Sequence, residues 1–167
     1  MDEFDFVVVG AGSAGAPIVD RLTASGRHSV LLLEAGPEAT NRWISIPLGF
    51  AKTFLDPGVN WKFATEPEPE LKGRRIYWPR GKVIGGSSAI NGMVYARGFA
   101  SDYDRWRQMG NEGWAFDDCL PYFKRLEAYP GGESDLHGGN GPVKITQGEY
   151  RNEMSEAFLA ACAEVGL

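Results

Sequence analysis

The feature that most limits the fold is a run of glycines, Gly10–Gly15, that follows one apolar stretch and precedes another. Residues 4–9 are largely apolar and end in three valines, which predicts a buried strand of a parallel sheet. The residues after the glycines have helical spacing that stops at Gly26, and residues 29–34 predict a second strand. This order, within about thirty residues, predicts a βαβ unit.

Three glycines and a glutamate occupy the positions that a dinucleotide site requires. Gly10 permits a tight turn, Gly12 lets the backbone approach a pyrophosphate, and Gly15 lets the helix pack close to the strand. The N-terminus of that helix offers unpaired N–H groups and a positive dipole end to the phosphates. Glu34, at the end of the second strand, can accept both ribose hydroxyls of an adenosine and would repel a 2′-phosphate. The unit therefore predicts NAD or FAD and disfavours NADP.

A second glycine-rich segment favours FAD over NAD. Residues 85–88, Gly-Gly-Ser-Ser, can present successive N–H groups as an anion-binding backbone nest. Asn91 carries the side-chain amide of this segment and can hydrogen-bond the polar edge of a ring. Beside a complete βαβ pattern, the segment is interpreted as contacting the far end of one long cofactor. The two glycine turns thus predict a flavin dinucleotide held at two places.

Composition and charge argue against several classes of function. The chain has 167 residues, enough for one domain, and a net charge of −5 without a run of Lys or Arg, which argues against nucleic acid as a partner. Its apolar runs are too short to span a bilayer, and an acidic start enters a strand directly, so a cytoplasmic protein is expected. Cys119, Cys162, His28 and His137 lack metal-ligand spacing, so no metal site is expected.

The middle of the chain has a weaker pattern. Prolines punctuate residues 37–79, in which 61–65 and 75–78 predict two strands of a hairpin. A long irregular connection inside a compact domain is usually functional, so this stretch is interpreted as a flap or lid over the cofactor. Beyond it, Ser101 and Asp117 are expected to cap two helices.

A short strand at 142–146 and a final helix, marked by Met154, Phe158, Cys162 and Val165, complete the sequence. The later strands of a doubly wound sheet are missing, so we expect an α/β, Rossmann-like FAD/NAD(P)-binding fold that is incomplete in this chain, with an inserted flap and small helices. The chain is expected to be the N-terminal part of a longer protein. The predicted regions are the βαβ core at 1–36, the flap and hairpin at 37–79, a second FAD-binding segment at 80–98, and at 99–167 a helical region with a short strand that leads to the rest of the protein.

These segments together resemble the glucose–methanol–choline oxidoreductases, a family of FAD-dependent alcohol oxidases and dehydrogenases. The resemblance spans nearly the whole chain and is most specific in residues 80–98, RGKVIGGSSAINGMVYARG. Within the family the chain is most similar to the bacterial choline-dehydrogenase-like and aryl- or furanic-alcohol oxidase branch. The segments that carry the resemblance are 10–15, 32–36, 80–98, 102–106, 113–114, 121–123, 137–138 and 141–142.

The resemblance implies FAD as the cofactor and implies a contact with each part of it. Some relatives attach FAD covalently through a His just before the position of Asn91, whereas this chain has Ile90 there, so non-covalent, dissociable FAD is expected. The contacts implied on the pyrophosphate and adenosine side are Gly10, Gly12, Ser13, Ala14, Gly15, Glu34 and Ala35. Trp61 is implied in the flap beside the cofactor, and Arg80 and Gly81 along its ribityl and phosphate side. The second segment would contribute Val83, Gly86 and Ser87, and the isoalloxazine would be lined by Asn91, Gly92, Met93 and Val94.

The resemblance also implies an activity. The intact enzyme would oxidise a primary alcohol to an aldehyde, with a His taking the alcohol proton, a hydride passing to flavin N5, and O₂ or another acceptor receiving the electrons. The catalytic His of the family lies near the C-terminus, and neither His28 nor His137 matches it, so no catalytic residue is expected in this chain. The alternatives are a cyanohydrin lyase or light-driven fatty-acid decarboxylase of the same family, or a non-catalytic FAD-binding fragment that needs the C-terminal part in trans.

Overall fold

The computed structural model describes residues 3–148, 150 and 152–166. The chain divides into two compact units, Met1–Val94 and Tyr95–Leu167. This boundary falls inside the predicted segment 80–98, and the division into four regions stays a prediction. Among the described residues, no helix combines the length and the apolar character needed to cross a membrane.

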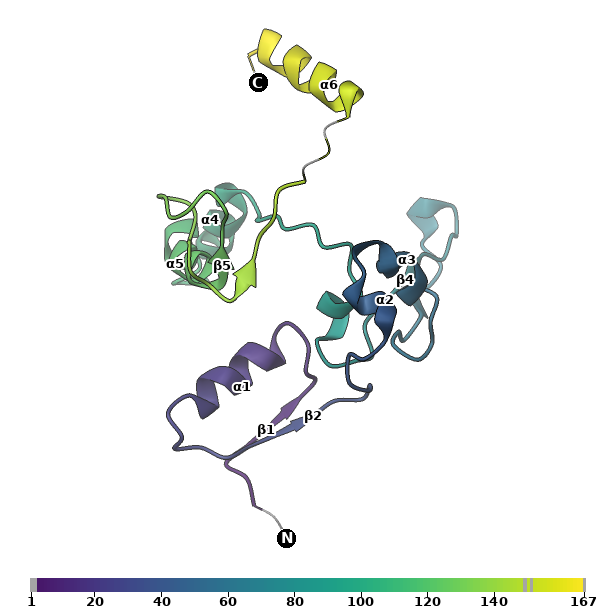
Figure 1. The fold of residues 1–167 in the computed structure, drawn as a ribbon, viewed down its shortest axis with the longest axis vertical. Coiled ribbons are helices and arrows are strands. Elements are labelled where there is room, and N and C mark those ends of the chain that lie inside the picture. Colours follow the sequence, from purple (N-terminus) through teal and green to yellow (C-terminus); the bar gives the residue numbers. More distant parts are fainter. Residues whose placement is uncertain (1–2, 149, 151, 167) are drawn as a thin grey trace. The chain divides into compact units, whose positions relative to one another are not determined.

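A βαβ unit lies at the start of the first unit, as the glycine pattern predicts (Figure 1). It consists of β1 (Phe6–Val9), α1 (Gly15–Thr23) and β2 (Val30–Leu33). The two strands are parallel and pair along their whole length, and α1 packs against both of them. Gly26 has a φ of +65°, which favours glycine and ends the helical stretch where the sequence predicts.

The two strands are more exposed than the sequence predicts. Val7 is 58% exposed and Val9 is 81% exposed. A parallel strand is buried when helices cover both faces of its sheet and neighbouring strands cover its edges. Among the described residues this sheet has two strands, so most of that cover is missing and the expected buried strand is not observed.

Three short helical turns lie in the stretch whose pattern is irregular. Asn41 accepts the N–H of Trp43 at 3.0 Å and so caps α2 (Arg42–Ser45). The 3₁₀ turn η1 (Pro47–Gly49) begins at a proline, and α3 (Phe50–Thr53) follows directly. Each turn is too short to show a helical period in the sequence, which explains why the sequence analysis does not predict it.

The predicted hairpin is confirmed, with shorter strands than expected. β3 (Phe63–Ala64) pairs antiparallel with β4 (Tyr77–Trp78), and the 3₁₀ turn η2 (Pro69–Leu71) lies in their connection. The hairpin begins and ends beside residues that line the cavity described below.

The core of the first unit is a small apolar cluster of Val59, Val83 and Ile90. It joins the residues before the hairpin to the second glycine segment, which forms the 3₁₀ turn η3 (Gly86–Ala89). The side chain of Val83 is fully buried in this cluster, although the resemblance implies a cofactor contact there. The whole residue is buried and does not line the cavity described below, so the structure does not bring Val83 to a ligand.

The second unit is mainly helical. α4 (Ala100–Gln108) packs against α5 (Phe116–Leu126), and α6 (Glu153–Glu164) lies near the end of the chain. β5 (Glu127–Ala128), which the sequence does not predict, pairs in parallel with the expected short strand β6 (Val143–Lys144).

Both predicted helix caps are wrong. Ser101 and Asp117 lie inside the first turns of α4 and α5 and do not precede them. The carboxylate of Asp102 instead reaches back from the third helical position and accepts the N–H of Phe99 at 2.9 Å. Asp118 does the same at the start of α5, at 3.1 Å. Because an acidic residue can satisfy a helix start from either side, the sequence alone places the cap within about two residues.

Candidate functional site

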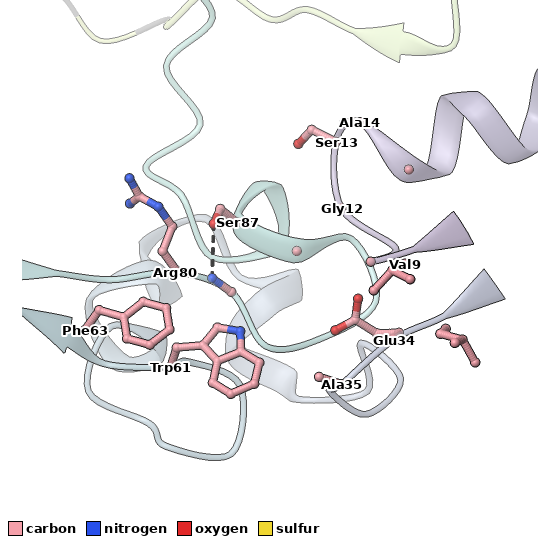
Figure 2. Close-up of a pocket in the computed structure, with 15 residues that line it drawn as sticks. Val9, Gly12, Ser13, Ala14, Glu34, Ala35, Trp61, Phe63, Arg80 and Ser87 are labelled. Atoms are coloured by element: carbon pink, nitrogen blue, oxygen red, sulfur yellow. Dashed lines mark hydrogen bonds between the residues drawn. The ribbon is translucent and has the colours of Figure 1, made fainter. Parts of the chain in front are cut away.

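A cavity of about 770 Å³ opens in the first unit at the carboxyl ends of β1 and β2. Ligands of parallel α/β sheets bind at this end, where the turns after the strands present N–H groups and helix N-termini. Figure 2 shows that its walls come from the turn before α1, the end of β2, the hairpin and the second glycine segment. The lining residues are Val9, Gly10, Gly12, Ser13, Ala14, Gly15, Leu33, Glu34, Ala35, Trp61, Phe63, Arg80, Gly81, Gly86 and Ser87.

The two glycine turns contact each other in this cavity. The N–H of Gly85 donates to the carbonyl oxygen of Ala11 at 2.8 Å, and a Cβ built on Gly86 would lie 2.7 Å from the Cα of Gly12. Gly86 also has a φ of +57°, which residues with a side chain rarely adopt. The sequence predicts two separate contact zones for these turns, but the Gly85 hydrogen bond holds the second segment against the first. The two turns therefore form one wall.

Glu34 holds the first glycine turn against the end of β2. One carboxylate oxygen accepts the N–H of Ala11 at 2.8 Å, and the other accepts the N–H of Gly36 at 2.9 Å. A carboxylate can accept about four hydrogen bonds, so each oxygen keeps capacity for a ligand hydroxyl. Glu34 is half-buried and its side chain lies in the cavity wall (Figure 2). It thus shapes the turn and also presents a carboxylate to the cavity.

The N-terminus of α1 faces the cavity through Ser13 and Ala14. The helix packs so close to the turn that a Cβ on Gly15 would clash with the carbonyl oxygen of Gly10. Gly10 itself has a φ of +95°, which permits the tight turn that the sequence predicts. Free N–H groups and the positive end of the helix dipole make this an anion-binding surface.

The hairpin side of the cavity is aromatic and cationic. The rings of Trp61 and Phe63 are stacked, with centroids 5.8 Å apart and an interplanar angle of 6°. The Lys82 ammonium lies 4.8 Å from the Trp61 ring, and the Arg80 guanidinium lies 5.0 Å from the Trp78 ring. Positive charge at the edge of an anion-binding surface would favour a pyrophosphate. The N–H of Gly81 donates to the Ser87 hydroxyl at 3.1 Å, which joins the hairpin side to the second glycine segment (Figure 2).

Sequence reasoning missed three residues of this cavity: Val9, Leu33 and Phe63. Val9 and Leu33 are the last residues of their strands, and such positions adjoin the ligand end of a parallel sheet. Phe63 lies two residues after Trp61, and in a strand this spacing places two side chains on one face. The position at the end of a strand could therefore have indicated Val9 and Leu33, and the two-residue repeat of side chains along a strand could have indicated Phe63.

The predicted isoalloxazine contacts, residues 91–94, lie apart from this cavity. Asn91 and Met93 line a second, smaller cavity of about 110 Å³ beside α2 and η1, and Gly92 and Val94 line neither. The Oδ1 atom of Asn91 accepts the N–H of Met93 at 2.9 Å. Met93 has a φ of +59°, an uncommon conformation for a residue with a side chain, and such strain clusters at functional sites.

The second unit contains a buried charged cluster around Glu127. Its carboxylate lies 2.6 Å from the Arg97 guanidinium and 3.0 Å from Nδ1 of His137, and it accepts the N–H of Gly138 at 2.8 Å. Burial alone would raise the pKa of Glu127, but these hydrogen bonds outweigh it and lower the pKa to about 2. His137 also stacks on Tyr129, with centroids 4.0 Å apart. The part of the chain that the structure describes contains no group of three or more His, Cys, Asp or Glu residues that could hold a metal ion.

The comparisons with known proteins agree on one family. The sequence model of the GMC oxidoreductase family matches residues 4–167 of this chain. The oxygen-dependent choline dehydrogenase of Rhizobium rhizogenes is 47% identical over 162 residues, which cover 97% of this chain and 30% of that protein. The chain thus spans about a third of the length of the curated relatives it matches.

Two solved structures have the same fold. Pyridoxine 4-oxidase from Mesorbium loti has a TM-score of 0.89 and 36% identity, and the match covers 99% of this chain and 33% of that one. An FAD-dependent oxidoreductase from Chaetomium thermophilum has a TM-score of 0.81 and 32% identity, covering 99% of this chain and 30% of that one. The predicted Rossmann-like fold, partial in this chain, is confirmed.

Proposed function

Because the chain belongs to the GMC oxidoreductase family, we propose that it forms the FAD-binding part of a flavin-dependent enzyme that oxidises a primary alcohol to an aldehyde. The observation that carries this proposal is the cavity at the ends of β1 and β2, walled by two touching glycine turns and Glu34. The relatives are about three times as long as the region they share with this chain. The reaction would therefore need a C-terminal remainder of the same protein.

The cavity fits the pyrophosphate and adenosine of FAD. Gly12 and Gly86 pack without a Cβ between them, so no side chain blocks a phosphate from the turn before α1. We assign Gly12, Ser13 and Ala14 to the pyrophosphate, with the N-terminus of α1 behind them. The remaining lone pairs of Glu34 would accept the ribose hydroxyls. Arg80 would add positive charge beside the phosphates.

Asn91, Gly92, Met93 and Val94 are assigned to the isoalloxazine. Since the Oδ1 atom of Asn91 is taken by Met93, its Nδ2 amino group is the part that would donate to a polar edge of the ring. Ser88, Ala89, Asn91 and Met93 form a small cavity with apolar side chains in and between α2 and η1, such as Trp43 and Ile46. This wall would exclude water from one side of the reacting ring.

We propose that FAD is bound non-covalently. Relatives that attach the flavin do so through a His at the position of Ile90. In this chain the Ile90 side chain is buried with Val59 and Val83 and carries no nucleophile. Binding would then depend on the cavity walls, and FAD should dissociate when the protein unfolds.

This assignment divides the reaction between FAD, the residues of this chain and the C-terminal remainder. FAD supplies the N5 atom that accepts a hydride from the alcohol carbon. The residues of this chain bind the cofactor, fix its orientation through backbone N–H groups, and screen it from water. Removal of the alcohol proton belongs to a His of the C-terminal remainder, and O₂ or another acceptor would receive the electrons.

The proposal is tested on two samples of the full-length protein: one is precipitated with acid, and the other, untreated, is assayed for activity. Flavin absorbance in the supernatant is expected, since non-covalent FAD is released on unfolding. Aldehyde should form from a primary alcohol in a panel that includes choline and aromatic alcohols. Protein without flavin, or with flavin in the pellet, would contradict the cofactor assignment, and flavoprotein that forms no aldehyde would contradict the activity.

A further inference from the structure

Asn60 is a buried polar side chain in the hairpin side of the first unit, with about 2% of its surface exposed. Its Nδ2 group donates to the carbonyl oxygen of Phe54 at 2.8 Å and to the Tyr77 hydroxyl at 3.0 Å. Its Oδ1 atom accepts the backbone N–H of Lys62 at 2.9 Å and that of Arg80 at 3.0 Å. The side chain therefore makes all the hydrogen bonds that an amide group offers.

The acceptor half of Asn60 replaces a missing part of the backbone ladder. Beyond β3 and β4, the N–H of Trp61 donates to the carbonyl oxygen of Arg80 at 2.9 Å, and Asn60 forms an isolated antiparallel bridge with Gly81. Lys62 has a φ of +56°, so regular pairing is interrupted there. The Asn60 oxygen accepts the N–H groups of Lys62 and Arg80 at this interruption.

One of the two residues held in this way, Arg80, lines the cavity, and so does Trp61, which lies between Asn60 and Lys62. Trp61 and Arg80 come from the segments that flank the hairpin strands, about twenty residues apart in sequence. The cavity wall there depends on how the two segments are joined, because both side chains are exposed and their ring and cation contacts are to residues of the same two segments. Figure 2 shows both side chains on the hairpin side of the cavity.

We propose that Asn60 is a positioning residue for FAD: through Oδ1 it joins the segments of Trp61 and Arg80 and so sets the hairpin wall of the cofactor cavity. The inference rests on the proposed function, and it adds a role to a residue that does not itself line the cavity. Asn60 acts through the backbone of Arg80, so its loss should widen this wall without removing a side chain from it.

Two variants distinguish the donor hydrogen bonds of the Asn60 amide from its acceptor hydrogen bonds. Asn60→Ala removes all of its hydrogen bonds, whereas Tyr77→Phe removes one partner of Nδ2 and leaves the acceptor bonds to Lys62 and Arg80. Both variants delete buried hydrogen bonds of the same cluster, so Tyr77→Phe is a matched control for lost stability. Asn60→Asp keeps the shape and the acceptor oxygen but loses both Nδ2 donor bonds, so it tests the acceptor bonds on their own.

The measurements are the FAD dissociation constant of the full-length apoprotein and amide hydrogen exchange at residues 62 and 80. Asn60→Ala should weaken FAD binding at least about tenfold, as expected when buried partners are left unpaired, and should speed exchange at both amides. Tyr77→Phe and Asn60→Asp should bind FAD much as the wild type does and keep both amides protected. Exchange is measured without FAD, so it reports the arrangement of the wall directly.

Each other outcome overturns the inference. If Asn60→Ala binds FAD like the wild type, or if Tyr77→Phe loses as much affinity, then Asn60 is structural and does not position the cofactor wall. If Asn60→Ala does not fold, Asn60→Asp becomes the test. If Asn60→Asp keeps the amides of residues 62 and 80 protected from exchange and still loses FAD affinity, then the acceptor bonds of Asn60 do not set the affinity, and the inference is wrong. Wild-type protein that binds no FAD contradicts the proposed function itself, and the positioning role fails with it.

Discussion

The N–H of Gly85 donates to the carbonyl oxygen of Ala11 at 2.8 Å and joins two glycine turns that lie far apart in the sequence. The contact brings Gly86 so close to Gly12 that a Cβ on Gly86 would lie 2.7 Å from the neighbouring Cα. The N–H groups of Gly85 and Gly86 donate to the carbonyl oxygens of Ala11 and Val83, so the second motif braces the first. The first turn, at the N-terminus of α1, is the part of this wall that can present N–H groups to an anion.

Gly86→Ala should weaken FAD binding and lower stability. The added methyl group meets the backbone of Gly12, and a φ of +57° costs about 1–2 kcal/mol for a residue with a side chain. Gly26→Ala is the matched control, because Gly26 has a φ of +65° and nothing within 4 Å of an added Cβ. Both variants should lose stability from the left-handed backbone, measured by thermal unfolding, but Gly86→Ala should lose more because of the clash with Gly12, and it alone should lose flavin affinity. Equal FAD dissociation constants would show that the turns need not touch.

Glu34→Gln should affect both the fold of the turn and the adenosine end of the cofactor. A neutral amide offers one acceptor oxygen, so the N–H of Ala11 or of Gly36 loses its partner, at a cost of about 1–3 kcal/mol. Glu38→Gln makes the same charge change at an exposed position nearby. Binding of ADP, which lacks the flavin ring, should weaken in Glu34→Gln and stay unchanged in Glu38→Gln. Unchanged ADP binding in both variants would remove Glu34 from the ribose.

Acid should destabilise the second unit through Glu127. The hydrogen bonds of this carboxylate lower its pKa to about 2 from an ordinary value of 4.5. A group whose pKa is lower in the folded state stabilises the fold above its unfolded pKa and loses that contribution as the pH falls. The melting temperature should therefore decrease as the pH falls from about 4.5 to about 2.

Glu127→Gln should flatten this pH dependence and lower the melting temperature at pH 7, because Arg97 would lose its ion-pair partner. Glu66→Gln is the control, since Glu66 pairs with Arg75 at 3.7 Å and both side chains are well exposed. Its melting curve should follow that of the wild type at every pH. A Glu127→Gln variant that keeps the full acid dependence would show that other carboxylates cause it.

The βαβ unit and its glycines were predictable because each element has a strong local pattern. The apolar runs ending at Val9 and Leu33 and the glycine spacing each point to the same local structure, and the structure agrees with them. The short turns from Arg42 to Thr53 have no period long enough to detect. The sequence misplaces the caps of α4 and α5 because Asp102 and Asp118 satisfy the first N–H groups from inside the helices, whereas a cap residue would do so from in front.

Long-range contacts of the site could not be predicted in the same way. The sequence shows that Gly86 and Gly12 are glycines, but not that they touch, because the Gly85 hydrogen bond joins segments about seventy residues apart. The sequence gives no indication of a role for Asn60, since an asparagine beside a tryptophan is ordinary in a loop. Its role depends on four partners from three segments, and these meet only in the folded chain.

The 167-residue chain by itself should associate through the apolar face of α6. Met154 is 78% exposed and Phe158 is 68% exposed, and exposed apolar surface of this kind drives contact between proteins. Phe158→Lys should reduce association in sedimentation velocity experiments over a concentration series. Ala160→Lys adds the same charge to the same helix while removing little apolar surface, so it should reduce association less. A cooperative melt of a monomeric, unmodified chain would contradict the prediction and would mean that this face needs no cover.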